Sequence, residues 1–189
     1  MQSTPAQSHC RSFGFTLLEL IVTMSIVVIL LGMGIPAFRA LTAKNLQASE
    51  INSFVHHFHL ARSLSITNQT HHVLCPSRDG VSCTNSGEWG QGYILYEDSN
   101  PNRTRDQNEQ LQSVHRPNQE MAIDIASSQH RRFVVYGGDG RPSGYNLTLT
   151  FCDPSSQIPP KAVILSNLGR VRVSGTRWDG SALSCGGDI

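Results

Sequence analysis

The stretch GRVRV at positions 169–173 contains two arginines whose spacing suits phosphate binding. Alternate residues of a β-strand point to the same face and lie about 7 Å apart. Arg170 and Arg172 would therefore project together, while Val171 and Val173 face inward. Guanidinium groups hold phosphates through directional, charge-assisted hydrogen bonds. The stretch thus predicts a surface that contacts a nucleic-acid backbone.

Other basic residues are close to this stretch in the sequence. Lys161 and Arg177 add positive charge, and no Asp or Glu occurs between Asp153 and Asp179. The formal net charge is only +1, so contact with DNA would depend on this local patch and would be sensitive to salt. Trp178 could stack on a base where strands separate, but a core or hinge position is the expected one. Basic residues also protect edge strands from aggregation, which is the alternative role for the whole patch.

The segment 98–109 has oxygen-bearing side chains at alternating positions, as calcium-binding loops do. The candidate ligands are Asp98, Asn100, Asn102, Asp106 and Glu109. The sixth position of such a loop is Gly because of its sharp turn, and here it is Arg103. Pro101 also intrudes, and the same residue types build ordinary turns. Calcium is therefore an alternative to a plain turn, and no other metal or cofactor is expected.

The five cysteines divide into one and four. Cys10 precedes a long apolar run, and the other four follow it: Cys75, Cys83, Cys152 and Cys185. Four cysteines beyond a membrane-length segment indicate an oxidising compartment and up to two disulfides. Of the three possible pairings we favour Cys75–Cys83 and Cys152–Cys185. Four free buried thiols are the alternative.

A single carboxylate, Glu19, lies inside the apolar run from Phe15 to Phe38. The run is long enough for a helix that spans a bilayer, which needs about 20 residues. A charged side chain inside a bilayer costs roughly 2.5–3.5 kcal/mol on insertion scales. Glu19 therefore needs a role. Pro36, near the far end of the run, is expected to kink or loosen the helix.

The residues around Glu19 resemble a known processing signal. The run GFTLLEL at 14–20 is similar to the class III signal of type IV pilins and type II secretion pseudopilins. The resemblance implies that a prepilin peptidase cuts after Gly14 and that Phe15 becomes the methylated N-terminus. It also implies that Glu19 pairs with the N-terminal amine of a neighbouring subunit. Such a pair replaces a lone buried charge in the assembled filament.

Apolar residues then recur at helical spacing, and no Pro occurs between Pro36 and Pro76. The residues of this face are Leu41, Leu46, Ile51, Phe54, Val55, Phe58, Ala61 and Leu64. The pattern predicts one helix from Phe15 to about Thr67. Its length would be about 80 Å at 1.5 Å per residue.

Three histidines on this helix, His56, His57 and His59, invite a metal interpretation. No nearby carboxylate or thiol completes a ligand set, so a solvated or packing role is expected. The sequence also has no nucleotide-binding loop, paired-cysteine metal motif or nucleophile elbow. Enzyme activity is therefore not expected.

From His72 onward, short β-type runs alternate with clusters of Gly, Asn, Pro and Ser. The expected strands are His72–Cys75, Gly92–Glu97, Leu111–His115, Arg132–Tyr136, Asn146–Phe151, Ala162–Leu165 and Val171–Val173. Their short, irregular separations favour antiparallel sheets over βαβ units. The predicted fold class is α+β, with a long N-terminal α-helix packed on antiparallel β-sheets.

We divide the chain into four segments. Residues 1–14 form a cleaved leader, and 15–38 form the half of the helix that spans the membrane or lies in a filament core. Residues 39–70 form the amphipathic half of the helix. Residues 71–189 form a globular antiparallel β domain.

Motifs along almost the whole chain resemble FimT/GspH-type minor pilins. They are LARS at 60–63, LCPS at 74–77, Trp89 with GYI at 92–94, GR at 140–141 and SNLGRVR at 166–172. In the FimT branch, a C-terminal Gly-Arg-x-Arg motif is associated with DNA binding, and Gly169, Arg170 and Arg172 fit it. The resemblance implies a minor pilin that binds double-stranded DNA and promotes uptake in natural transformation.

The alternative is a structural minor pilin or type II secretion pseudopilin, which initiates filament assembly without binding nucleic acid. Both versions imply other pilin subunits and prepilin peptidase as partners. Both also imply a single-pass protein of the bacterial inner membrane with a periplasmic C-terminal domain. That protein would later join a pilus or pseudopilus at the cell surface.

Overall fold

The computed structural model describes residues 16–117, 124–127, 131–143 and 146–185. The chain forms two units, residues 1–39 and 40–189. One helix, α1 (Leu17–Asn68), contributes to both units. The end of this helix lies one residue beyond the predicted Thr67, whereas the predicted start at Phe15 lies outside the described residues.

The first unit contains the apolar part of α1, whose side chains are exposed as far as Arg39. Among the described residues, α1 is the one helix long and apolar enough to cross a membrane, as judged by length and composition. The helix continues through Pro36. At its start, the backbone N–H of Glu19 donates to Thr16 Oγ1 at 3.2 Å, so Thr16 caps the first turn.

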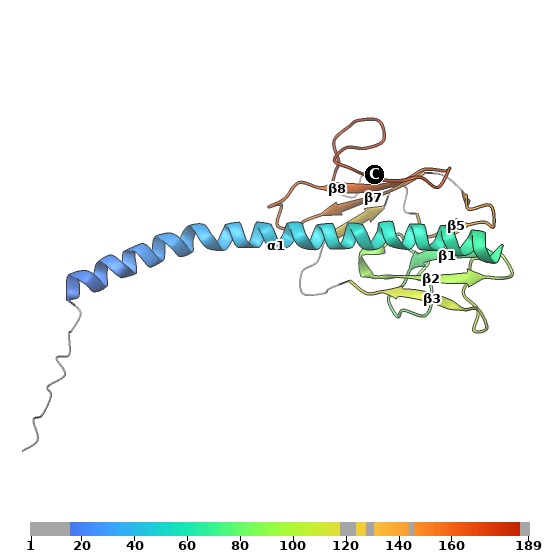
Figure 1. Ribbon diagram of the computed structural model, residues 1–189, viewed down its shortest axis with the longest axis horizontal. Coiled ribbons are helices and arrows are strands. Elements are labelled where there is room, and N and C mark those ends of the chain that lie inside the picture. Colours follow the sequence, from blue (N-terminus) through green and yellow to red (C-terminus); the bar gives the residue numbers. More distant parts are fainter. Residues whose placement is uncertain (1–15, 118–123, 128–130, 144–145, 186–189) are drawn as a thin grey trace, which may run out of the picture. The chain divides into compact units, whose positions relative to one another are not determined.

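The second unit contains two antiparallel sheets, with α1 running between them (Figure 1). The first sheet has the order β3-β2-β1-β5-β6, with β1 (His71–Pro76), β2 (Tyr93–Asp98), β3 (Leu111–His115), β5 (Val134–Tyr136) and β6 (Pro142–Ser143). The second has the order β4-β7-β8-β9, with β4 (Asp124–Ser127), β7 (Leu147–Cys152), β8 (Lys161–Leu165) and β9 (Val171–Ser174). A 3₁₀ helix, η1 (Trp89–Gln91), precedes β2.

This arrangement confirms the α+β prediction. Every expected strand is present to within a few residues at its ends, and the sequence interpretation missed β4 and β6. Strand β6 has two residues and begins with a proline. Strand β4 reads DIAS and has one β-branched residue, so neither has the composition that identifies a strand.

The core forms where one face of α1 meets both sheets. The helix contributes Ile51, Phe54, Phe58 and Ala61, which pack with Tyr93 and Leu95 of the first sheet and Leu149, Phe151 and Val163 of the second. Leu41 is 55 % exposed, so its predicted place on the packed face is wrong. Helical periodicity identifies a face but does not say where along the helix packing begins.

A polar cluster lies at the edge of this core, between α1 and strands β2 and β3. His57 Nδ1 lies 2.7 Å from the carbonyl oxygen of Ser53, and its Nε2 lies 2.9 Å from Ser113 Oγ. The carbonyl can only accept, so Nδ1 carries the proton and Nε2 accepts from the hydroxyl. His115 Nε2 lies 2.9 Å from Glu50 Oε2. Burial lowers the pKa of His57, because the charged ring loses its hydration.

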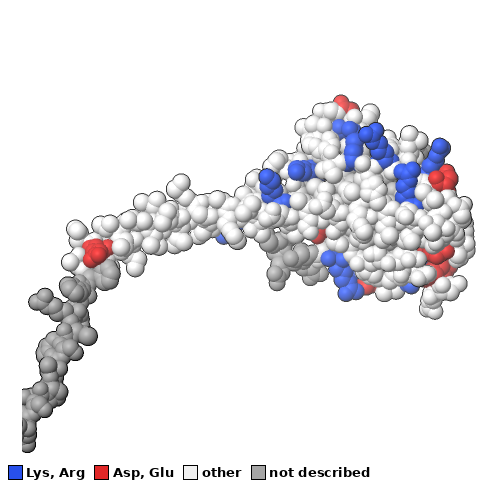
Figure 2. Space-filling view, viewed as in Figure 1, with Lys and Arg blue, Asp and Glu red and all other residues white. Residues whose placement is uncertain are grey.

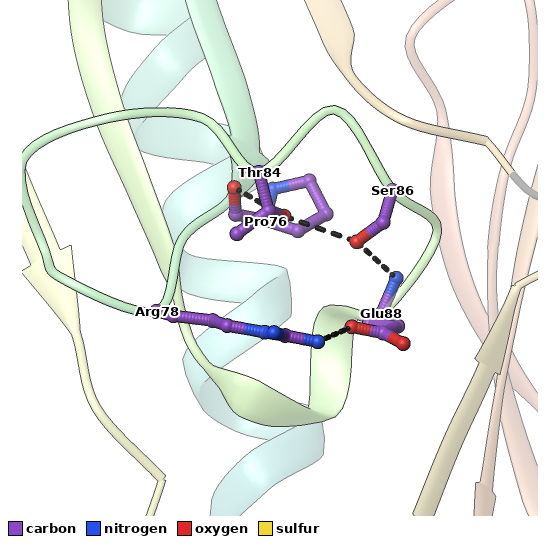
Figure 3. A network of polar contacts seen from close by, with 5 residues as sticks. All are labelled: Pro76, Arg78, Thr84, Ser86 and Glu88. Atoms are coloured by element: carbon purple, nitrogen blue, oxygen red, sulfur yellow. Dashed lines mark hydrogen bonds and ion pairs between the residues drawn. The ribbon is translucent and has the colours of Figure 1, made fainter.

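The opposite face of the first sheet has its own apolar cluster, which includes Val73, Cys75, Ile94 and Tyr96. The loop at 77–88 follows β1 and is tied back to that strand by the Cys75–Cys83 disulfide. Figure 3 shows how polar contacts hold this loop closed. These contacts are the Arg78–Glu88 ion pair, the hydrogen bond from Thr84 Oγ1 to the Pro76 carbonyl oxygen at 3.2 Å, and the hydrogen bond between the hydroxyl groups of Thr84 and Ser86.

Candidate nucleic-acid interface

The hairpin between β8 and β9 positions the predicted DNA-binding arginines. Its turn is closed by hydrogen bonds from Gly169 N to Ser166 O at 2.9 Å and from Ser166 N to Arg170 O at 3.0 Å. Ser166 Oγ also accepts from Arg170 N at 3.1 Å. Gly169 has a φ of +80°, the left-handed conformation that this kind of turn requires at its last residue.

Gly169 is buried against two other parts of the chain. Its carbonyl oxygen accepts from Arg62 Nη1 of α1 at 3.1 Å. A Cβ at this position would lie 3.2 Å from the carbonyl oxygen of Gly140 and 3.3 Å from Pro142 Cδ. Gly169 therefore shapes the turn, and its place in the motif is structural.

Arg170 and Arg172 are both exposed. Strand β9 is the edge of its sheet, and Arg172 is paired with Ile164 of β8. Paired residues share a face and alternate residues repeat it. Arg170 and Arg172 therefore lie on the face of the sheet that points away from α1.

The two valines of the motif differ from each other. Val171 packs on the core, as expected, but Val173 is 50 % exposed. Val173 lies on the same strand face as Val171, as expected, and is paired with the core residue Val163. It stays exposed because β9 is an edge strand, whose outer side has no neighbouring strand to cover it.

Lys161 and Arg177 are placed differently from Arg170 and Arg172. Lys161 is exposed and is paired with Phe151, so strand alternation assigns it to the core-facing side at the far end of β8. It does not extend the surface formed by Arg170 and Arg172. Arg177 is half-buried in the segment after β9, where its charge acts on Asp179.

Trp178 is 71 % exposed, so the expected core position is wrong. This exposure does not test the alternative expectation, a hinge position. The residues next to Trp178 in the sequence are polar or glycine, so no apolar periodicity indicates which way its side chain points. The structure also adds an arginine that the sequence interpretation left out of the site. Arg141 is exposed and follows Gly140, whose carbonyl lies against Gly169, so its backbone is next to that of Arg170.

Figure 2 shows basic side chains gathered over the sheet that contains β7 and β8, with acidic side chains at the margin. Within the part of the chain that the structure describes, Arg170, Arg172 and Arg141 make no ion pair. Their guanidinium groups are thus available to an external anion. We call Arg141, Arg170 and Arg172 together the basic edge.

The segment 98–109 gathers the five predicted calcium ligands, but through hydrogen bonds to one another and to the backbone. Asp98 accepts from the N–H groups of Asn102 and Arg103 at 3.1 and 2.9 Å. Glu109 accepts from Ser99 N and Asp106 N at 2.9 and 3.0 Å. Asn100 and Asn102 both donate to Asp106 Oδ2. The carboxylates thus hold the loop, and no metal-binding cluster of His, Cys, Asp and Glu occurs among the described residues.

The cysteines form the two favoured disulfides, Cys75–Cys83 and Cys152–Cys185. The second joins β7 to the segment that follows β9 and Trp178. It thereby fixes both ends of the part of the chain that holds the arginines.

The residues predicted for processing and assembly belong to the first unit. Gly14 and Phe15 lie outside the described residues. Glu19 is exposed in the first turn of α1, where an acidic side chain also suits the positive end of the helix dipole.

The fold is similar to that of solved filament subunits. The type IV minor pilin FimU of Pseudomonas aeruginosa superposes with a TM-score of 0.53 at 12 % identity, covering 71 % of this chain and 92 % of that one. The minor pseudopilin EpsH of the Vibrio cholerae type 2 secretion system gives a TM-score of 0.45 at 12 % identity, covering 67 % and 94 %. The similarity to FimU identifies the architecture as a type IV pilin-like fold.

Family models then identify the chain more closely. The model described as Type II transport protein GspH matches residues 50–169, which is more than half of the chain, and the protein belongs to this family. The model of the prokaryotic N-terminal methylation motif matches residues 10–35. No match was found among curated protein sequences.

Proposed function

We propose that the protein is a minor subunit of a type IV pilin-like filament that binds DNA without sequence preference and promotes its uptake. The observation that carries this proposal is the pair of exposed guanidinium groups of Arg170 and Arg172 on one face of an edge strand. Arg141 adds a third from the neighbouring turn. Alternate strand residues lie about 7 Å apart, so the two guanidinium groups can each form charge-assisted hydrogen bonds with a phosphate of one nucleic-acid backbone.

In this proposal the first unit anchors the precursor in the membrane and later mediates its assembly into the filament. The methylation motif at 10–35 and the apolar part of α1 suit a precursor held in the bacterial inner membrane. Prepilin peptidase would cut after Gly14 and methylate Phe15. Glu19 would then pair with the N-terminus of another pilin subunit, and the second unit would face the periplasm before assembly.

A gel-shift titration with the full chain in detergent tests the DNA contact. The parent is expected to bind duplex DNA of unrelated sequences equally, with an affinity that falls steeply as salt rises. Because each phosphate contact contributes about 1 to the salt slope, Arg170→Ala with Arg172→Ala should reduce that slope by roughly 2. Arg141→Ala should reduce it by about 1.

A matched control removes the same charge elsewhere. Arg116→Ala with Arg132→Ala takes away two exposed arginines of the first sheet, one directly after β3 and one shortly before β5. This control should bind nearly as well as the parent. A parent that does not bind, or a β9 double variant that binds as well as the parent, would remove the proposal.

The second candidate is a structural minor pilin or pseudopilin that starts filament assembly and binds no nucleic acid. The GspH family match favours it, because the family is described as a type II transport protein. The match ends at position 169, one residue before Arg170. Membership of the family therefore lends no support to the arginine pair. A deletion strain that loses filaments, and regains both filaments and the parent level of DNA uptake with the Arg170→Ala, Arg172→Ala variant, would support this second function.

A further inference from the structure

Trp178 is presented to solvent by a short, closed hairpin that follows β9. It is 71 % exposed, whereas the other tryptophan, Trp89, is 1 % exposed in the core. Tryptophan has a large apolar ring, and burial is its usual state unless it meets a ligand or partner. The ring of Trp178 therefore has a surface that the described fold does not use.

The backbone around Trp178 is held in place. Arg177 N donates to Ser181 O at 2.9 Å, Gly180 N donates to Arg177 O at 3.1 Å, and Thr176 forms a bridge with Ala182. Trp178 is thus the second residue of a closed turn that begins at Arg177, rather than part of an open loop. The Cys152–Cys185 disulfide closes the base of this hairpin on β7.

The hairpin directly follows β9, the strand that begins after Arg170 and contains Arg172. Trp178 is eight residues from Arg170, a distance of at most about 27 Å at 3.4 Å per residue. Arg177 directly precedes the ring, and the carboxylate of Asp179 is engaged by its own turn through Ser181 N and Oγ at 2.9 and 2.7 Å. The ring is therefore reachable by a strand whose phosphates lie on Arg170 and Arg172.

We propose that Trp178 is a stacking platform for an unpaired base, and that the basic edge with this hairpin takes single-stranded DNA in preference to duplex. The inference rests on the DNA-binding function proposed above. Every base has a π-face, so stacking on an indole ring needs no particular sequence, while the guanidinium groups follow the backbone. In a duplex the bases are paired and stacked, and the ring has no base face to contact.

The two-tryptophan chain provides a direct readout, because Trp89 is buried and Trp178 is exposed. The full chain in detergent is titrated with an oligo-dT of about 12 nucleotides, within the usual site size, and with a blunt duplex of equal length. Expected results with oligo-dT are quenching of the exposed tryptophan and its protection from acrylamide, a neutral quencher that the DNA charge does not repel. The duplex should leave acrylamide quenching unchanged.

Variants measure how much the ring contributes. Trp178→Ala should weaken oligo-dT binding roughly 5- to 150-fold, the range that corresponds to the stacking of one base, and should change duplex affinity less than twofold. Trp178→Phe should restore most of the difference, because a smaller aromatic ring still stacks. Leu168→Ala is the matched control, since Leu168 is 63 % exposed at the other end of β9 and should not affect either ligand. Thermal melting of each variant shows that the fold is intact.

The outcomes separate the two proposals. If the parent binds neither DNA, both fall. If the parent binds duplex and oligo-dT equally and Trp178→Ala changes neither, stacking is overturned while the phosphate-binding function stands. If anionic phospholipid vesicles protect Trp178 from acrylamide and oligo-dT does not, the ring is a membrane contact and the inference is wrong.

Discussion

The guanidinium of Arg62 donates to the carbonyl oxygen of Gly169 at 3.1 Å. This bond joins the last part of α1 to the turn from which β9 starts. The direction of the basic edge is therefore set by residues that would not touch DNA. It follows that the Gly and the arginines of the 169–172 motif have separable roles.

Gly169→Ala is expected to destabilise the second unit by roughly 1–3 kcal/mol, the usual cost of a residue held in a sparsely populated backbone region. The φ of +80° disfavours any side chain, and the new Cβ would press on Arg62 Nη1 at 3.1 Å. Urea unfolding of the full chain in detergent measures the loss. Gly175→Ala is the matched control, because a Cβ there meets nothing within 4 Å. Equal stability of the two variants would contradict this account.

Arg170→Ala, by contrast, should change stability by no more than about 0.5 kcal/mol, as exposed substitutions usually do. The same urea titration gives the value. A large loss of stability would mean that Arg170 serves the fold, and its effect on DNA binding could then not be assigned to a phosphate contact.

Stability should fall as the pH drops from about 7.5 to 5, the range around the ordinary His pKa of about 6.5. The pKa of His57 is lowered, first by burial and then by the charges of His115 and His56, although the Ser53 carbonyl opposes the shift. The folded state thus binds the proton less tightly than the unfolded state, so stability is full above the unfolded pKa and is lost below it. His72, also buried, contributes with the same sign.

His57→Gln should flatten this pH dependence, whatever its effect on absolute stability. His59→Gln is the control, because His59 is exposed on the same helix. Melting temperatures measured above pH 5 exclude the titration of Asp79, whose pKa is lowered from 3.8 by hydrogen bonds from Ser82 and Val81. An unchanged slope in His57→Gln would rule out this histidine as the cause.

The long helix, most strands and the two disulfides could be predicted because each has a local signature: helical periodicity, alternating apolar runs or paired cysteines. The positions of Lys161, Trp178 and Arg141 could not. Lys161 and Arg172 are close in sequence and in the same hairpin, yet the register of β8 with β9 assigns them to opposite faces. Arg141 is near Arg170 only because two turns from different sheets meet at Gly169.

The capping of α1 is a different case, because its sequence signal was present. Thr16-Leu17-Leu18-Glu19 has the Thr-x-x-Glu form of a capping box, and the structure shows the bond from Glu19 N to Thr16 Oγ1. The same four residues therefore carry two signals, a processing motif that involves the carboxylate of Glu19 and a helix cap that involves its backbone N–H.

Loss of the Cys152–Cys185 disulfide should destabilise the protein more than loss of Cys75–Cys83. The bridges span 33 and 8 residues, for which loop-closure entropy gives about 3.7 and about 2.5 kcal/mol. Double Cys→Ala variants and urea unfolding test the order. Because Cys75 is buried in an apolar cluster, its replacement also leaves a cavity. Reduction of each variant that keeps only one bridge therefore gives a second comparison, in which no further side chain is changed. The reverse order under reduction would contradict the entropy argument.

Chelator should leave the melting temperature unchanged, because the carboxylates of Asp98 and Glu109 already accept backbone N–H groups. Glu109→Gln should lower it, since the amide accepts less strongly than a carboxylate. Thermal melts with calcium, with chelator and with neither test both statements. A calcium-dependent rise in the melting temperature, absent in Glu109→Gln, would restore the metal interpretation of this loop.

Glu19→Ala should be processed normally but should enter filaments poorly, because the proposed partner of its carboxylate is the N-terminus of a neighbouring subunit in the assembled state. The N–H of Glu19 also takes part in the Thr16 cap, so two further variants are needed to separate the effect of the charge from that of the cap. Glu19→Gln keeps the shape and removes the charge, and Thr16→Val removes the capping oxygen and keeps the charge.

Mass spectrometry of the N-terminus measures processing, and immunoblots of sheared filaments measure incorporation. Poor incorporation of both Glu19 variants with normal incorporation of Thr16→Val would assign the role to the charge. Normal incorporation of Glu19→Gln would assign it to helix capping, and the proposed ion pair would be wrong.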